Sequence, residues 1–204
     1  MRCTPVSIPT DASFTQDSLD TGRVIIRPFD PEVDLNSQIT KLLRRAVASI
    51  DVASNLPVHC QRRERTVHRD TVDEACFVAV CKGRLAGTLT LRGADPVSTC
   101  RHFRRPDVAT VHRYGVEPSR QRRGIGRALL SFANRWAAAH GYMQLALEAP
   151  MNAQGLLDFY RSQGFSLVDS VRFPGCEYES AVLTRPSLPG WPCFRMSRVR
   201  YRSR

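Results

Sequence analysis

The most constraining feature of this chain of 204 residues is a glycine-rich hexapeptide, Gln121-Arg122-Arg123-Gly124-Ile125-Gly126, between a strand-like segment and an amphipathic helix. The first N–H groups of a helix have no intrahelical acceptor, and the aligned peptide dipoles leave partial positive charge there. Such a helix start binds anions, and glycines let a ligand approach the backbone closely. Arg120, Arg122 and Arg123 add further positive charge. The hexapeptide therefore predicts a site for a multiply charged anion, and we interpret that anion as a pyrophosphate.

Length and composition predict one domain with tails. A chain of this length, with 42% hydrophobic residues, can bury one core. We expect a flexible N-terminal segment over residues 1–22, a globular domain over 23–184, and a basic, disordered tail over 185–204. The net charge is +11, and the tail carries six arginines and no acidic residue, so subtracting six leaves only +5 for the rest. The basic character belongs largely to the tail.

The cysteines and the N-terminus favour a soluble, cytoplasmic protein. Seven cysteines form no C-x-x-C pair, which fits reduced thiols in a cytosol. The start of the chain lacks an apolar signal core, and no run approaches the roughly 18 apolar residues of a membrane span. The histidines and cysteines lack metal-ligand spacing. We expect no membrane partner and no metal.

Hydrophobic periodicity predicts the order β-α-β-β-β-α-β-α-β-β. Residues 51–74 read as a short helix or a variable loop, and 93–107 as a loop. Lys82-Gly83-Arg84 has the length and chemistry of a hairpin turn. The expected strands are 24–26, 76–81, 85–91, 108–116, 143–149, 165–168 and 178–184, and the expected helices are 35–50, 125–137 and 153–163.

Two familiar phosphate-binding motifs do not fit the hexapeptide. A Walker loop ends in Gly-Lys-Ser/Thr, whereas Gly126-Arg127-Ala128 lacks the lysine and the hydroxyl that binds magnesium. A Rossmann turn needs a third glycine within a βαβ unit, and Gly124-Ile125-Gly126 stands without it.

The sequence closely resembles the GNAT superfamily of acyl-CoA-dependent N-acyltransferases. The signature Q/R-x-x-G-x-G/A is matched by Gln121, Gly124 and Gly126, and Val116-Glu117-Pro118 precedes it at the expected distance. Phe159 to Phe165 resembles the closing F/L-Y-x-x-x-G-F segment of that family. The resemblance covers residues 23–184. It implies an α+β fold, with a mixed, mostly antiparallel twisted sheet flanked by helices, and an N-acetyltransferase that uses acetyl-CoA as co-substrate.

The same resemblance assigns residues to the cofactor. The strand that includes Tyr114 and ends at Val116 would hydrogen-bond the pantetheine, with a β-bulge at Tyr114-Gly115-Val116 opening a gap beside it. Many relatives carry an asparagine seven residues before the closing tyrosine. That position is Ala153 here, so Asn152 would reach the cofactor only after a register shift. The residues that would wrap the pyrophosphate are Gln121, Arg122, Arg123, Gly124, Ile125, Gly126 and Arg127.

Acyl transfer to an amine needs a neutral amine, a stabilised oxyanion and a proton for the leaving thiolate. An alkylamine with a pKa of about 10.4 is almost fully protonated at neutral pH, so a base is required. We favour Glu148, with Glu117 as the alternative, acting directly or through ordered water. The resemblance makes Tyr160 the general acid. It implies direct attack in a ternary complex, with no covalent enzyme intermediate.

The acceptor is an amine-bearing small molecule or peptide that the sequence does not identify. We expect specificity in residues 51–74, 93–107 and 170–180, the least constrained stretches. A homodimer remains open. A competing hypothesis is a GNAT fold without catalysis, whose tail binds RNA or another polyanion, because arginines contact phosphates and aromatic rings stack on bases. That tail contains Arg195, Arg198, Arg200, Arg202 and Arg204, with Trp191, Phe194 and Tyr201.

Overall fold

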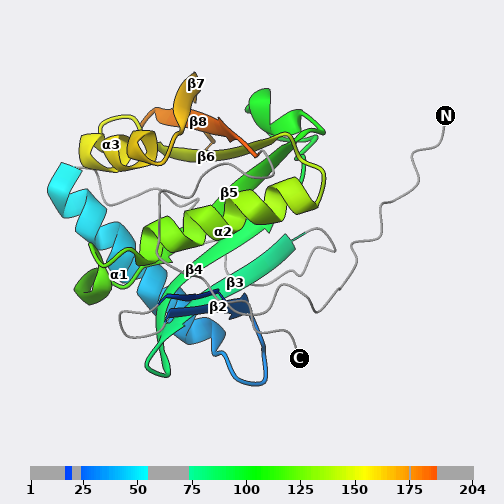
Figure 1. Ribbon diagram of the computed structural model, residues 1–204. Coiled ribbons are helices and arrows are strands. Elements are labelled where there is room, and N and C mark those ends of the chain that lie inside the picture. The colour runs from blue at the N-terminus through cyan, green and yellow to red at the C-terminus, as the bar shows by residue number, and fades with distance from the viewer. Residues whose placement is uncertain (1–16, 20–23, 55–73, 175, 188–204) are drawn as a thin grey trace.

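The computed structural model describes residues 17–19, 24–54, 74–174 and 176–187. Its described strands form a single sheet in the order β1-β2-β3-β4-β5-β6-β8-β7 (Figure 1). Only β5 and β6 are parallel neighbours, and every other neighbouring pair is antiparallel. This confirms the mixed, mostly antiparallel sheet. The strands are β1 (Asp17–Leu19), β2 (Val24–Pro28), β3 (Glu74–Cys81), β4 (Arg84–Arg92), β5 (Val108–Val116), β6 (Gln144–Pro150), β7 (Ser166–Val171) and β8 (Ser180–Pro186).

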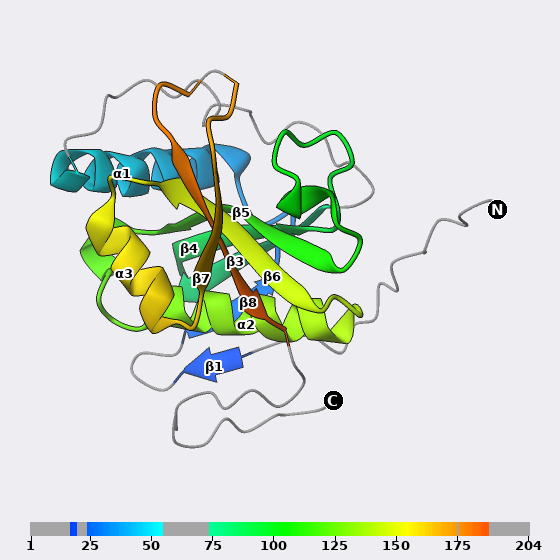
Figure 2. The same ribbon diagram turned by 90° about the horizontal axis from the view of Figure 1, so that it is seen from above.

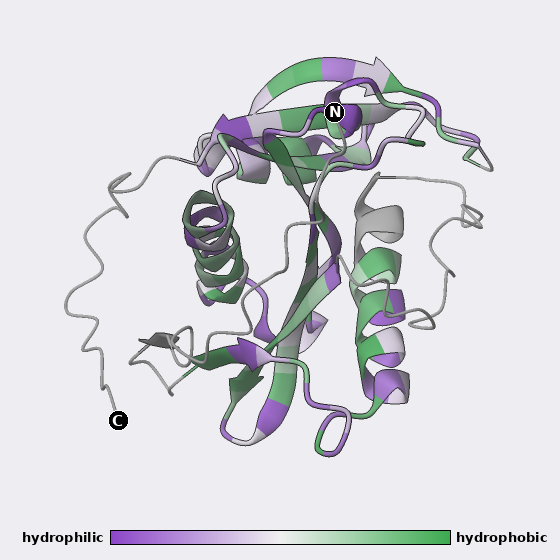
Figure 3. Cartoon of the chain, turned by 90° about the vertical axis from the view of Figure 1, so that its right-hand side faces the viewer, coloured by the Kyte–Doolittle hydropathy of each residue, from purple (hydrophilic) through white to green (hydrophobic). Residues whose placement is uncertain are grey.

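Three α-helices within the described residues pack on the sheet. Figures 2 and 3 show α1 (Asn36–Ser54) on one face and α2 (Ile125–Ala139) on the other. The third helix, α3 (Gln154–Ser162), shares a core cluster with α2. Short 3₁₀ helices, η3 (His102–Arg104) and η4 (Pro118–Arg120), lie on either side of β5 in the chain. In the described residues, no helix combines the length and the apolarity needed to cross a membrane.

Helix α2 forms where its sequence pattern predicts. It starts after Gly124, which has φ +82°, and is followed by Gly141 at φ +79°. These left-handed conformations cost glycine little, so they end the helix cleanly at both sides. Its apolar stripe is buried in the core against β4 and β6. The buried stripe includes Ile125, Leu129, Phe132, Ala133, Trp136 and Ala137.

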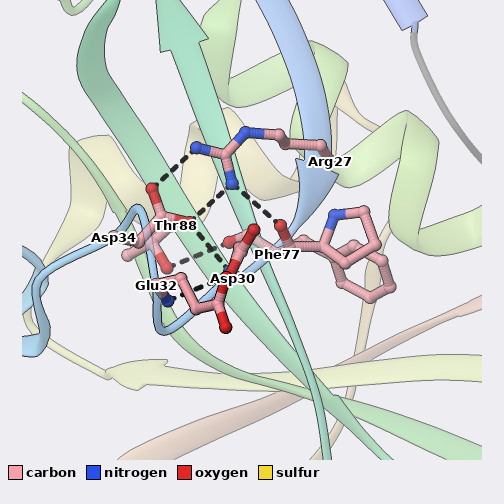
Figure 4. Close-up of polar contacts among 7 residues, drawn as sticks. Arg27, Asp30, Glu32, Asp34, Phe77 and Thr88 are labelled. Carbon is pink, nitrogen blue, oxygen red and sulfur yellow. Dashed lines mark hydrogen bonds and ion pairs between the residues drawn. The ribbon is translucent and has the colours of Figure 1, made fainter.

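An ion pair fixes the loop that leads from β2 into α1 (Figure 4). The Arg27 guanidinium donates to both carboxylate oxygens of Asp34, at 2.5 and 2.7 Å. The backbone amide of Asp30 also donates to Asp34. Burial opposes ionisation of Asp34, but these hydrogen bonds outweigh it and lower the pKa of the carboxyl group. The start of α1 is thereby tied to the sheet.

Three details differ from the sequence predictions. Asp17–Leu19 pairs with β2 as an edge strand inside the segment expected to be flexible, because backbone pairing requires no apolar periodicity. At the other end, β8 runs to Pro186, and the buried Ser187 donates its amide to Met143. The ordered domain therefore continues past the predicted limit at 184. Cys176 is disulfide-bonded, not reduced as expected.

Several predictions fall outside the described residues. They are the character of residues 1–16, of most of the 51–74 stretch and of the tail from residue 188 onward. All ten predicted helices and strands are present in the predicted order.

Candidate active site

The sheet opens between β5 and β6. These parallel strands pair only at Val108–Thr110 with Gln144–Ala146, although both continue for several residues. On its other side, β5 pairs with β4, and there Thr88 faces Gly115 while Thr90 faces His112. One residue on β4, Leu89, thus lies opposite two residues on β5, Arg113 and Tyr114. The extra residue makes a β-bulge at Arg113–Tyr114, and Arg113 has φ +45°.

The bulge lies just before the predicted position, and Gly115 has another role. A Cβ on Gly115 would lie 3.0 Å from Leu43 Cδ2 and 3.4 Å from Ala46 Cβ. Glycine at this position allows α1 to pack closely on β5.

A cavity of about 310 Å³ lies at this opening. Leu43 and Val47 of α1 line it on one face of the sheet, and Leu156 and Tyr160 of α3 line it on the other. The cavity therefore reaches both faces of the sheet at the point where β5 and β6 separate. The two strands contribute Thr110 to Tyr114 and Leu147 to Pro150 to its wall.

The glycine-rich turn lies beside this cavity. The turn contains two left-handed residues, Arg122 (φ +62°) and Gly124. The first backbone bond of α2 joins the amide of Ala128 to the Gly124 carbonyl at 2.9 Å, so the amides of 122–127 precede it. A Cβ on Gly126 would lie 2.5 Å from the hydroxyl of Tyr114, which also lines the cavity. Tyr114 thus connects the turn with the cavity.

The other predicted cofactor residues take different positions. Arg122, Arg123 and Arg127 are exposed, and Ile125 is buried in the core. The Gln121 side chain donates to the Val116 carbonyl at 3.3 Å and holds the turn against the end of β5.

Asn152 is exposed and does not line the cavity, whereas Ala153 is fully buried before α3. A register shift that would turn Asn152 inward is not observed, because Ala153 occupies the inward position.

Tyr160 reaches the cavity from α3. Its side chain is buried, and its ring centroid lies 6.2 Å from that of Tyr114. Burial raises the pKa of Tyr160 above its ordinary value. Burial and the neighbouring Tyr160 also raise the pKa of Tyr114. Both phenols therefore carry their protons at neutral pH.

The structure separates the two carboxylates considered as bases. Glu148 lies half-buried on β6 and lines the cavity. Among the described residues, Glu117 does not line this cavity. Its carboxylate accepts two hydrogen bonds from Arg45 of α1, at 3.1 and 2.6 Å. Glu148 is placed to reach a ligand in the opening, and Glu117 is held by a cation on α1.

Sequence reasoning missed five charged or histidine residues of the cavity wall, namely Glu74, Arg92, Asp95, His112 and Arg113. His112 and Arg113 lie on β5, and the Nε2 atom of His112 is 2.9 Å from Thr110 Oγ1. Glu74 and Arg92 form an ion pair between β3 and β4. A signal was present, since His112 and Arg113 interrupt an otherwise apolar strand immediately before Tyr114 and Gly115.

Comparisons with known proteins agree with this geometry. The family model described as "Acetyltransferase (GNAT) family" matches residues 44–165. The GNAT domain of S. lividans PAT superposes with a TM-score of 0.62 at 17% identity, over 86% of this chain and 98% of that one. No curated protein sequence matches significantly.

Two further solved structures are similar. The PaiA N-acetyltransferase of Thermoplasma acidophilum, solved with coenzyme A, has a TM-score of 0.60 at 14% identity, over 80% of this chain and 98% of that one. The ribosomal-protein-S18-alanine N-acetyltransferase of Escherichia coli has a TM-score of 0.55 at 21% identity, over 84% and 99% respectively. These likenesses establish the fold, and the family match covers more than half of the sequence. The chain belongs to the GNAT family of acetyltransferases.

Proposed function

We propose that this protein transfers an acetyl group from acetyl-CoA to a primary amine by direct attack in a ternary complex. The observation that supports the proposal is the opening between β5 and β6, where Tyr160 and Glu148 line one cavity and Tyr114 of its wall approaches Gly126 of the glycine-rich turn. Family membership supports the reaction class. The coenzyme A complex of the Thermoplasma relative supports the donor.

The donor would bind along the turn and the opened strand. The amides of residues 122–127 and the positive end of α2 would receive the pyrophosphate, and Arg122, Arg123 and Arg127 would add charge. The edge of β5 beyond Thr110 is released from β6, so its backbone groups would pair with the pantetheine amides. This arrangement would leave the thioester in the cavity.

Glu148 would remove the proton from the acceptor ammonium, with His112 beside it on the neighbouring strand. The neutral nitrogen would attack the thioester carbonyl, and a backbone N–H near Val116 would stabilise the oxyanion. The C–S bond would then break. The thiolate leaves with a pKa near 8.5, and burial keeps the pKa of Tyr160 above that of a thiol. Tyr160 would therefore donate a hydrogen bond to the leaving sulfur, because complete proton transfer from it is uphill. The proton that the attacking nitrogen gives up as it becomes an amide would pass to the thiolate, so that CoA leaves as the free thiol.

A panel of small amines, amino acids and peptides tests the reaction. Purified protein should release free CoA thiol from acetyl-CoA only when an acceptor is present. Mass spectrometry should show that this acceptor has gained one acetyl group. Glu148→Gln should lower kcat/KM about 100-fold or more at pH 7. Glu117→Gln, the matched carboxylate change, should stay within about threefold of the wild type. A panel without any acetylated product would contradict the proposal, and a loss confined to Glu117→Gln would move the base to that residue.

A further inference from the structure

Arg113 occupies an unusual backbone conformation at the cavity wall. Its φ of +45° lies in the left-handed region that glycine adopts most readily. Val111 belongs to the core cluster on the α2 side, and Tyr114 packs against the same cluster. In a regular strand, residues three positions apart point to opposite faces of the sheet. The bulge absorbs Arg113 between them and leaves its side chain in the cavity lining. A strained non-glycine residue at a ligand cavity points to a use for its side chain.

The charge of Arg113 is only partly compensated. The carboxylate of Glu74, 7% exposed, contacts Arg92 directly and lies 3.8 Å from Arg113 Nη1. That longer distance makes an ion pair but no hydrogen bond. Within the described residues, Glu74 is the only ion-pair partner of Arg113, and no side-chain hydrogen bond of Arg113 is formed. One carboxylate thus serves two guanidinium groups, and the N–H donors of Arg113 can receive another anion.

A carboxylate stands on the other side of the opening. Thr110 and Ala146 are the last paired residues of β5 and β6, and Glu148 lies two residues beyond Ala146. On β5, Arg113 lies three residues beyond Thr110, and both side chains line the same cavity. Across the opening, the wall therefore presents the carboxylate of Glu148 on β6 and the guanidinium of Arg113 on β5, in addition to Glu74, Arg92 and Asp95 elsewhere in the lining.

The volume of the cavity favours a small acceptor. Its volume of about 310 Å³ is at the lower end of the roughly 300–1,000 Å³ typical of ligand pockets, and the acyl end of the donor would share it.

We infer that the acceptor is a small zwitterion, a primary amine that also carries a carboxylate, and that Arg113 binds this carboxylate while Glu148 receives the ammonium. This inference rests on the proposed acetyltransferase function and names its substrate class. A bidentate guanidinium–carboxylate contact would orient the amine toward the thioester and would select amino acids over plain amines.

The test compares amino acids with their decarboxylated counterparts: L-lysine with cadaverine, L-ornithine with putrescine, and L-phenylalanine with phenethylamine. For each pair that the wild type acetylates, its kcat/KM should be at least about tenfold higher for the amino acid than for the plain amine. Arg113→Gln and Arg113→Gly should lower that value about 10- to 100-fold and leave the plain amine within about threefold. Arg113→Lys should retain part of the preference.

Arg113→Gly accommodates the left-handed backbone, so it keeps the test valid if Arg113→Gln folds poorly. Arg104→Gln is the control, because it removes an exposed arginine that is absent from the cavity lining in the described residues. It should change neither the kcat/KM for the amino acid nor that for the plain amine. Calorimetry with the three amino acids in the presence of CoA, which has no acyl group to transfer, measures acceptor binding without turnover.

The outcomes separate the two proposals. If no amine is acetylated but the wild type binds an amino acid in the presence of CoA and Arg113→Gly does not, the proposed reaction fails and the zwitterion site stands. Equal use of both members of each pair by the wild type overturns the inference. An equal fall for both members in Arg113→Gly, or the absence of amino acid binding with CoA, also overturns it.

Discussion

Burial changes the chemistry of individual side chains in the cavity, and Tyr160 shows this most clearly. Its phenol would titrate near pH 10 in water, and the surrounding core raises its pKa further. The group therefore stays protonated across the range in which enzymes are usually assayed. Its contribution to the reaction should not depend on pH.

Tyr160→Phe keeps the ring in the core and removes only the hydroxyl. We expect kcat to fall about 10- to 100-fold, with the KM for acetyl-CoA within about threefold of the wild type. The ratio of mutant to wild-type kcat should be the same from pH 6 to pH 9, measured by steady-state kinetics. Tyr142→Phe, which changes a tyrosine outside the described lining, should behave as the wild type. An unchanged kcat for Tyr160→Phe would exclude the role.

At the scale of the elements, close packing of α1 on β5 shapes the cavity wall. Gly115 allows the helix to approach the strand next to the bulge, and the Arg27–Asp34 ion pair fixes the loop that starts α1. Both features belong to the scaffold. Changing either should affect stability more directly than chemistry.

Gly115→Ala should lower the free energy of unfolding by about 1–3 kcal/mol, because the new methyl group would meet Leu43 Cδ2 at 3.0 Å. Gly155→Ala in α3 is the matched control. No heavy atom lies within 4 Å of a Cβ there, so alanine should be neutral or stabilise the helix by up to about 1 kcal/mol. Urea unfolding measures both changes. Equal effects would show that the α1–β5 contact is not tight.

Asp34→Asn should destabilise the protein in a pH-dependent way. Because the pKa of Asp34 is lowered in the fold, its contribution is present above the unfolded pKa of about 3.9 and is lost as pH falls through the folded value. We expect a loss of about 1 kcal/mol at pH 7 that shrinks below pH 4, measured by urea unfolding at several pH values. A difference that does not change with pH would contradict the ionic contribution.

At the scale of the whole molecule, the sheet order brings together segments that are distant in sequence. The sheet is completed by β8, whose end contacts other parts of the domain. The Arg185 guanidinium donates to the Gln163 carbonyl at 2.8 Å and lies over the Phe165 ring. Ser187 is buried and bonds to the segment before β6. The described part of the domain therefore includes Arg185 and Ser187.

Truncation after Ser187 should leave CoA binding and acetyl transfer within about twofold of the full chain. Truncation after Thr184 removes the contacts of Arg185 and Ser187 and should lower Tm by several degrees. Thermal unfolding and turnover of both variants test this. If removal of residues 188–204 abolishes polyanion binding and the protein acetylates no amine, the competing hypothesis of a non-catalytic binding protein is favoured.

The amino-acid sequence by itself determined the local elements, the glycine-rich turn and the family. Periodicity, turn residues and helix ends depend on neighbours along the chain, so they can be read from residues such as Gly124, Gly141 and the α2 stripe. Tyr160 could be selected as a candidate in the same way, because it belongs to a local motif, and the structure shows that it lines the cavity.

Only the tertiary structure decided how the cavity is built. The bulge at Arg113, the ion pair that holds Glu117, and the exposed position of Asn152 all depend on residues far away in sequence. His112, Arg113 and Glu148 come together because two parallel strands pair for three residues and then separate. The register between distant strands is set by packing of the whole core, and no local pattern in the sequence contains it.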